Sequence, residues 1–342
     1  MSSRDLIQSA LDGKQPERIP VSVISTAWTY NYYGMDLNEV GYDSDSMAEA
    51  WLRFDNDFDA DAVCPMFSPL IIPEYYGTEL RIPEGGFPIV KKPAITDASD
   101  IDELGEFDSS EEPRAQAALD CVEKLVDELG SQKCIWLATI GPVSNVSRLM
   151  ETQTLMMQLI EEPESVHKVF KWSTEVWKSA IEPFLDLVDI VDFSDPVASP
   201  DMISPRMYND FFWEYDKEVV DWLHDSGTNA VYHVCGDVLR IIDQMEETTA
   251  DGLSVDAPLD LEKAREAVPD ATIVGNIDPA NQLLEGTPES VVQASKEAMY
   301  AGGRNGPMIL APGCDVPPTS PAENVLAMIR AAKEHGAYPL NL

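Results

Sequence analysis

Short apolar runs alternate with amphipathic helical stretches along almost the whole chain, and this alternation restricts the fold more than any other feature. Eight runs rich in β-branched or apolar residues are bounded by Gly, Pro or Asp, as strands commonly are. They span residues 19–26, 61–67, 133–140, 189–195, 230–236, 252–257, 271–278 and 307–313. Because a helical pattern follows each run, the order predicts parallel strands joined by helices, and eight such units predict a (β/α)8 TIM barrel.

The length of 342 residues fits a single barrel domain over residues 1–342 with two additions. The stretch at residues 3–12 predicts an extra N-terminal helix. Residues 74–113, which are rich in Pro, Gly and acidic residues, predict a loop insertion between a strand and its helix. Two interpretations of this insertion stay open: a small hairpin lid over the mouth of the barrel, or a solvated loop.

Acidic residues outnumber basic ones by 61 to 23, which gives a formal net charge of −38. The acids are spread along the chain, so they indicate a solvated acidic shell of the kind suited to a saline cytoplasm, with an ordinary acidic protein as the alternative. No cluster of Lys and Arg stands out, and binding to nucleic acid is therefore not expected.

The sequence also bears on the compartment. No apolar stretch reaches the ~18 residues of a membrane span, and the first residues lack the apolar core of a secretory signal. We therefore expect a cytoplasmic protein without membrane contact. The five cysteines are odd in number and irregular in spacing, so they predict no disulfide framework and leave thiols free to bind metal.

Polar side chains stand where several apolar runs end. They are Ser194, Asp195, His233, Cys235, Asp256, Asn276, Asp278 and Cys314. In a TIM barrel these strand ends face one mouth, which is where such enzymes keep their active sites. Asn276 and Asp278 are candidates for lining this mouth, although polar residues at strand ends also serve as simple caps.

Three of these residues predict a zinc site. Imidazole and thiolate are preferred zinc donors, and His233, Cys235 and Cys314 supply only three of them, which leaves a fourth position for water, a carboxylate or a substrate. An open position points to catalysis. The alternative is that both cysteines are inert core thiols and that His233 is a satisfied polar residue at a strand end.

Motifs along nearly the whole chain resemble the uroporphyrinogen decarboxylase superfamily, and specifically its branch of methylcobamide:coenzyme M methyltransferases. They are RIPV, TIGPVSNVSRLM, DFSDPVASPDMISPRMYNDFFWEY, HVCGDV, GLSVDAPLDLEKAR, VGNIDP and LAPGCDVPPTSPAENVLAMIRAA. The resemblance assigns the catalytic zinc to His233, Cys235 and Cys314. It also makes Asp256 the candidate fourth ligand or a partner that orients His233, although the family pattern would place a longer Glu there.

The resemblance implies a zinc-dependent methyltransferase that moves a methyl group from a methylcobamide to a small thiol, with coenzyme M of methanogenesis as the expected acceptor. Zinc converts a bound thiol to the nucleophilic thiolate. The chain has no D-x-H-x-x-G motif of its own for a cobamide, so a separate small corrinoid protein is the expected partner. Arg148 and Arg206 are candidates for binding the anionic tail of the thiol, because guanidinium forks suit oxyanions.

Other functions remain open. One is a corrinoid methyltransferase with another acceptor or donor, such as tetrahydrofolate, homocysteine or an O-demethylation substrate. A second is a uroporphyrinogen decarboxylase-like enzyme, but the arginine-containing R-Q-A-G-R loop of that branch is replaced here by VISTAWTYNYYG, and its catalytic Asp has no match in CPMFSPLIIPEYYG. A third is a non-catalytic barrel that binds a corrinoid or a porphyrin.

Overall fold

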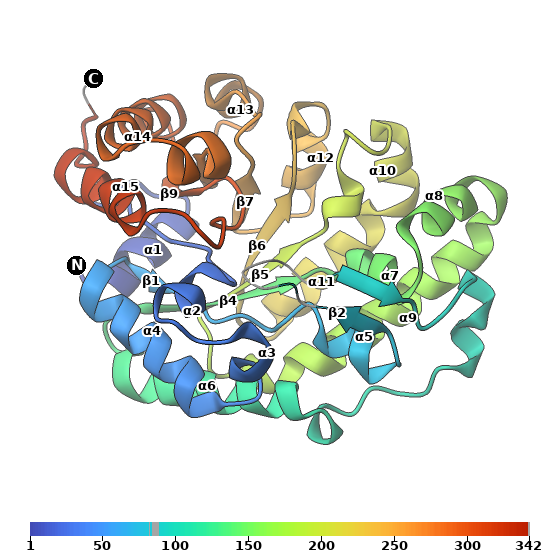
Figure 1. The fold of residues 1–342 in the computed structure, drawn as a ribbon. Coiled ribbons are helices and arrows are strands. Elements are labelled where there is room, and N and C mark those ends of the chain that lie inside the picture. The colour runs from blue at the N-terminus through green and yellow to red at the C-terminus, as the bar shows by residue number, and fades with distance from the viewer. Residues whose placement is uncertain (82, 84–88, 341–342) are drawn as a thin grey trace.

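The computed structural model describes residues 1–81, 83 and 89–340 of the chain. Its centre is a curled parallel sheet surrounded by helices, and the two termini lie on the same side of the molecule (Figure 1). The strands are β1 (Ala62–Val63), β4 (Cys134–Ile140), β5 (Ile190–Ser194), β6 (Asn229–Val234), β7 (Gly252–Val255), β8 (Ile273–Ile277) and β9 (Met308–Pro312). They pair in this order, each parallel to the next, which confirms seven of the eight predicted strands and the α/β barrel.

The prediction of a regular strand over residues 19–26 is wrong. This segment is extended and lies between β9 and β1. Its backbone bonds include Ser22 N to Leu310 O, Leu310 N to Pro20 O and Asp61 N to Val21 O, all at 2.9 Å. Pro20 has no N–H to donate, and the N–H of Val21 binds the Asp61 carboxylate instead of a neighbouring carbonyl. The segment therefore closes the ring of strands without forming a continuous ladder.

Helices cover the outside of the ring. They are α1 (Ser3–Leu11), α2 (Trp28–Tyr32), α3 (Leu37–Val40), α4 (Ser44–Phe58), α5 (Ile71–Tyr75), α6 (Pro113–Leu129), α7 (Pro142–Leu149), α8 (Thr152–Glu161), α9 (Pro163–Ile181), α10 (Pro205–Phe211), α11 (Trp213–Asp225), α12 (Ile242–Glu247), α13 (Leu261–Ala267), α14 (Pro288–Gly303) and α15 (Ala322–His335). Short 3-10 turns span Ala98–Glu103, Ser109–Glu111, Glu182–Phe184, Pro196–Ala198 and Val238–Arg240, and a π-helical turn spans Pro279–Leu284. Among the helices in the described part of the chain, none combines the length and the apolar character that crossing a bilayer requires.

Both predicted additions to the barrel are present. The N-terminal helix α1 begins with a capping box in which Ser2 and Asp5 bind each other's backbone N–H groups. The insertion contains an antiparallel hairpin of β2 (Glu79–Arg81) and β3 (Ile89–Lys92), and residues 82 and 84–88 of its tip lie outside the described residues. Just before the hairpin, Thr78 Oγ1 donates a hydrogen bond to the carbonyl oxygen of Arg148 in α7 at 3.2 Å. A role as a lid stays a prediction.

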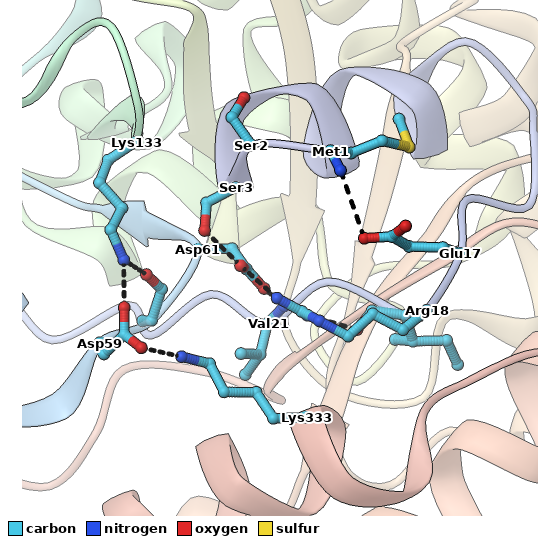
Figure 2. A network of polar contacts seen from close by, with 12 residues as sticks. Met1, Ser2, Ser3, Glu17, Arg18, Val21, Asp59, Asp61, Lys133 and Lys333 are labelled. Atoms are coloured by element: carbon cyan, nitrogen blue, oxygen red, sulfur yellow. Dashed lines mark hydrogen bonds and ion pairs between the residues drawn. The ribbon is translucent and has the colours of Figure 1, made fainter.

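A polar network fastens the base of the barrel, at the opposite end from the mouth (Figure 2). The Asp61 carboxylate is fully buried and accepts hydrogen bonds from Ser3 Oγ at 2.6 Å, from both terminal nitrogens of Arg18 at 2.7 Å and from Val21 N at 2.9 Å. Beside it, Lys133 Nζ lies 2.6 Å from Asp59 and 3.0 Å from Asp55, and Asp59 also contacts Lys333. These contacts join α1, the extended segment, the ends of α4 and α15, and the start of β4.

Candidate metal centre

Strand β6 places His233 in the interior of the barrel. Its backbone pairs with Ser194 of β5 on one side and with Ser254 of β7 on the other, so the ring is held between two strands. The Nδ1 atom lies 3.1 Å from Ser254 Oγ and 3.2 Å from Ser254 O. Because Nδ1 is engaged there, the Nε2 atom is the one that faces Cys235, with its Sγ at 3.3 Å.

Cys235 follows β6 directly, and one residue, Gly313, separates β9 from Cys314. At Gly313 an added Cβ would lie only 2.6 Å from Ala257 N, so glycine lets the loop after β9 pack closely on the loop after β7. The ligand atoms of His233, Cys235 and Cys314 all lie within 4.8 Å of one another, and in the described residues they form the one such group of three.

The donor set fits a zinc ion. Two donors bound tetrahedrally at ~2.0–2.3 Å from one Zn²⁺ lie about 3.5 Å apart, which is close to the Nε2–Sγ distance of 3.3 Å. The protons of the three groups are also coupled. The contact between the two thiols lowers the pKa of Cys235 and raises the pKa of Cys314. Burial alone would lower the pKa of His233, but the neighbouring Cys314 raises it. A cation bound here would replace these shared protons.

Asp256 lies outside the group of three. Its Oδ2 accepts the N–H of Gly236 at 2.9 Å, and its Oδ1 accepts that of Ala257 at 2.7 Å. The carboxylate therefore holds the turn after Cys235, where Gly236 takes a φ of +85° that few other residues tolerate. The Asn276 amide donates to Asp256 O at 3.1 Å and so fixes the loop that carries this Asp.

A pocket of about 380 Å³ opens beside the group, within the ~300–1,000 Å³ range of small-molecule sites. His233, Cys235 and Cys314 all line it, as does Arg148 from α7. Arg206 on α10 is 90% exposed, pairs with Asp210 at 3.2 Å and does not line this pocket. The structure thus brings only one of the two predicted anion-binding arginines to the site.

Asp278 also lies away from the pocket, because its carboxylate caps the π-helical turn by accepting the N–H groups of Ala280 and Asn281. Polar pocket residues that sequence reasoning missed include two acids. Asp192 accepts a hydrogen bond from Trp136 Nε1 at 3.0 Å, and burial raises its pKa to about 6. Asp315 accepts one from Thr26 N at 2.8 Å, and burial raises its pKa likewise to about 6. Two signals in the sequence could have identified them: Asp192 lies inside a predicted strand, and Asp315 directly follows Cys314.

Arg114, at the start of α6, is a third missed residue of the pocket wall. No signal in the sequence set it apart, since the helix that carries it lies on the outside of the ring of strands and reaches the pocket through the packing of α4 against α6. The pocket thus contains two arginines and two acids besides the three candidate ligands.

The sequence profile of the uroporphyrinogen decarboxylase (URO-D) family matches residues 2–335. The chain belongs to this family. It is 28% identical over 252 residues, 72% of each chain, to a methylcobamide:CoM methyltransferase, MtbA, of Methanosarcina acetivorans. It is 27% identical over 352 residues, 97% of each chain, to a uroporphyrinogen decarboxylase of Prochlorococcus marinus.

Among solved structures, a methyltransferase from Methanosarcina mazei superposes with a TM-score of 0.87 over 98% of this chain and 99% of that one, at 23% identity. This similarity confirms the fold. The family membership and the curated relatives confirm the resemblance to the methyltransferase branch that the motifs predicted.

Proposed function

We propose that this protein is a zinc-dependent methyltransferase that moves a methyl group from a methylcobamide, carried by a small corrinoid protein, to a small thiol, with coenzyme M as the expected acceptor. The observation that carries the proposal is the convergence of one imidazole and two thiols on the wall of the pocket. The methylcobamide:CoM methyltransferases among the relatives support the same reaction.

The roles of the residues follow from their positions. His233, Cys235 and Cys314 would hold the ion, and a neutral imidazole with two thiolates balances its charge. When bound, zinc would lower the pKa of the acceptor thiol and supply it as a thiolate. Ser254 fixes the orientation of the His233 ring through Nδ1. Asp256 acts through the turn that follows Cys235, so we assign it a role in positioning Cys235 in place of direct ligation or of orienting His233, whose Nδ1 is held by Ser254.

Arg148 would bind the anionic tail of the acceptor. No hydrogen bond or ion pair of its guanidinium group occurs within the described residues, although the group lines the pocket and is largely withdrawn from solvent, which lowers its pKa. Asp195 is the protein carboxylate that acts on the charge of Arg148, and an oxyanion of the acceptor would add a direct partner. The substrate sulfur would then take the methyl group, and the electron pair of the broken bond would stay with the corrinoid.

The decarboxylase-like alternative has one observation in its favour, because the Prochlorococcus decarboxylase aligns over 97% of the chain. It predicts carboxyl loss from uroporphyrinogen without added metal. Methyltransferases with tetrahydrofolate, homocysteine or O-demethylation chemistry would differ in acceptor or donor, and a carrier barrel would bind a corrinoid or a porphyrin without turnover.

Metal analysis combined with methyl transfer tests the proposal. Wild type, His233→Ala and Cys314→Ala would be compared with Cys121→Ala, whose thiol is buried in α6 away from the group. We expect about one zinc per chain and transfer from methylcobalamin to coenzyme M in wild type and in Cys121→Ala, with both lost in the other two variants. Retention of metal and activity in His233→Ala and Cys314→Ala would refute the proposed centre.

A further inference from the structure

Arg114 is buried in the wall of the same pocket, on the first turn of α6. Its side chain is only 7% exposed. The guanidinium carbon lies 4.0 Å from the centre of the Tyr42 ring. Glu74 Oε2 lies 3.0 Å from Nε, but this ion pair lacks the geometry of a hydrogen bond. Within the residues that the structure describes, Nε is buried without a hydrogen-bond acceptor, and neither terminal nitrogen makes a hydrogen bond to the protein.

The unused donors define a binding position. A guanidinium group carries five N–H donors in a planar fork. The two terminal nitrogens are not among the fully buried atoms, so they keep contact with the pocket, where a ligand could bind them. Glu74 balances the charge from the side of Nε, so the two terminal nitrogens remain for a ligand. They suit bidentate contact with a carboxylate, sulfonate or phosphate.

The pocket wall that Arg114 shares with the candidate metal ligands is mostly apolar. It includes Ile24, Tyr30, Leu37, Val40, Met47 and Met66. A ligand that spans the pocket must therefore carry an apolar middle section. Burying each methylene group strengthens binding by about fourfold, so this wall favours an alkyl chain over a polar one.

We propose that the pocket accepts thiols longer than coenzyme M, in which the sulfur faces the group of His233, Cys235 and Cys314 and an oxyanion at the far end of an alkyl chain binds Arg114. This inference rests on the proposed thiol-methylating function and names a wider class of acceptor for it. Arg148 serves the tail of a short acceptor, and Arg114 serves the tail of a long one.

Gly41 provides an independent way to perturb this position. A Cβ added to Gly41 would lie 2.5 Å from Arg114 Nη1, and the φ of Gly41 is −65°, which alanine adopts readily. Gly41→Ala should therefore displace the guanidinium group while its charge stays in the protein. Arg114→Gln removes the charge but keeps a polar side chain.

Calorimetric binding to the zinc-loaded protein tests the inference with mercaptopropionate, mercaptohexanoate, mercaptooctanoate and the uncharged mercaptohexanol. In wild type we expect mercaptohexanoate to bind more than tenfold tighter than mercaptohexanol, which matches it in length, as a charge-assisted contact implies. Arg114→Gln and Gly41→Ala should abolish this preference and leave mercaptopropionate unchanged. The control is Arg53→Gln, because Arg53 also stacks on a tyrosine and pairs with a glutamate but is half-exposed and outside the pocket.

An unchanged preference in Arg114→Gln would overturn the inference, and so would an effect confined to the KM for methylcobalamin, which would assign Arg114 to the corrinoid. Binding requires no methyl transfer, so the two proposals fail separately. If no thiol is methylated but the preference depends on Arg114, only the proposed function fails. If methylation depends on Cys314 but the preference for the carboxylate thiol is unchanged in Arg114→Gln, only this inference fails.

Discussion

Replacing Asp61 with alanine should destabilise the whole barrel, because this carboxylate completes the joint between the extended segment and β1. The substitution removes four hydrogen bonds, two of them from Arg18, whose side chain is only 18% exposed. Removing one partner of a buried ion pair costs about 3–5 kcal/mol, and an orphaned backbone N–H such as that of Val21 costs a further ~1–3 kcal/mol. Since Arg18 keeps some contact with water, we expect a total loss of ~4 kcal/mol.

The loss should appear as a lower melting temperature. With an unfolding entropy of about 2.1 cal/mol/K per residue and 342 residues, ~4 kcal/mol corresponds to a decrease in Tm of about 5–6 °C. Calorimetry at fixed salt and metal concentration would measure it. Asp61→Asn keeps an acceptor oxygen and should lose about half as much.

The matched control is Asp45→Asn, which breaks an ion pair with Lys124 at 2.6 Å in which the Asp is 89% exposed. Such surface pairs are worth less than ~1 kcal/mol, so its Tm should change by no more than about 1 °C. If the decrease in Tm of Asp61→Ala were as small as that of Asp45→Asn, the reasoning that the network at the base holds the ring closed would be refuted.

Three further results are expected. Burial alone would raise the pKa of Asp59, but Lys133 and Lys333 lower it below its usual value of 3.8. The stability that Asp59 adds is therefore present above pH 3.8 and is lost as the pH falls through the pKa that Asp59 has in the folded protein. Asp59→Asn should therefore melt below wild type at pH 7 and converge with it in strong acid; a constant gap would contradict this. Ser254→Ala should weaken zinc binding by about tenfold in a chelator competition, since it removes a partner of His233 Nδ1, and unchanged affinity would exclude that role. Unfolding followed against KCl should show stabilisation by molar salt, because a net charge of −38 repels itself when unscreened, whereas indifference to salt would count against a salt-adapted surface.

The strands were predictable where burial acts on both faces. Residues 230–236 and 307–313 read as uninterrupted apolar runs because β6 and β9 are fully enclosed apart from one strand end. Residues 19–26 also show the β-branched pattern of a strand, yet their hydrogen bonding depends on Pro20 and on a carboxylate forty residues away in the sequence. The pattern of neighbouring residues carries no information about that long-range contact. The sequence therefore predicted a regular strand where the chain forms the extended segment.

The meeting of His233, Cys235 and Cys314 was predictable for a geometric reason, since the carboxyl ends of parallel strands share one rim. The arginines were not predictable in the same way. Arg148 and Arg206 both lie on helices that follow strands, and only the direction in which each helix presents its side chain separates a pocket residue from a surface one. Arg114 reaches the pocket through helix packing alone.

The extended segment that closes the ring also forms part of the wall of the pocket, through Ile24 and Thr26. Its lower end is clamped at the base by Arg18 and Asp61. Its upper end is held by Asp315, which accepts hydrogen bonds from the N–H and the hydroxyl of Thr26, and by a bond from Val316 N to Ile24 O at 3.1 Å. Because Asp315 directly follows Cys314, the loop that supplies a candidate metal ligand also anchors this side of the pocket wall. A displacement of that loop would therefore move the wall and the ligand together.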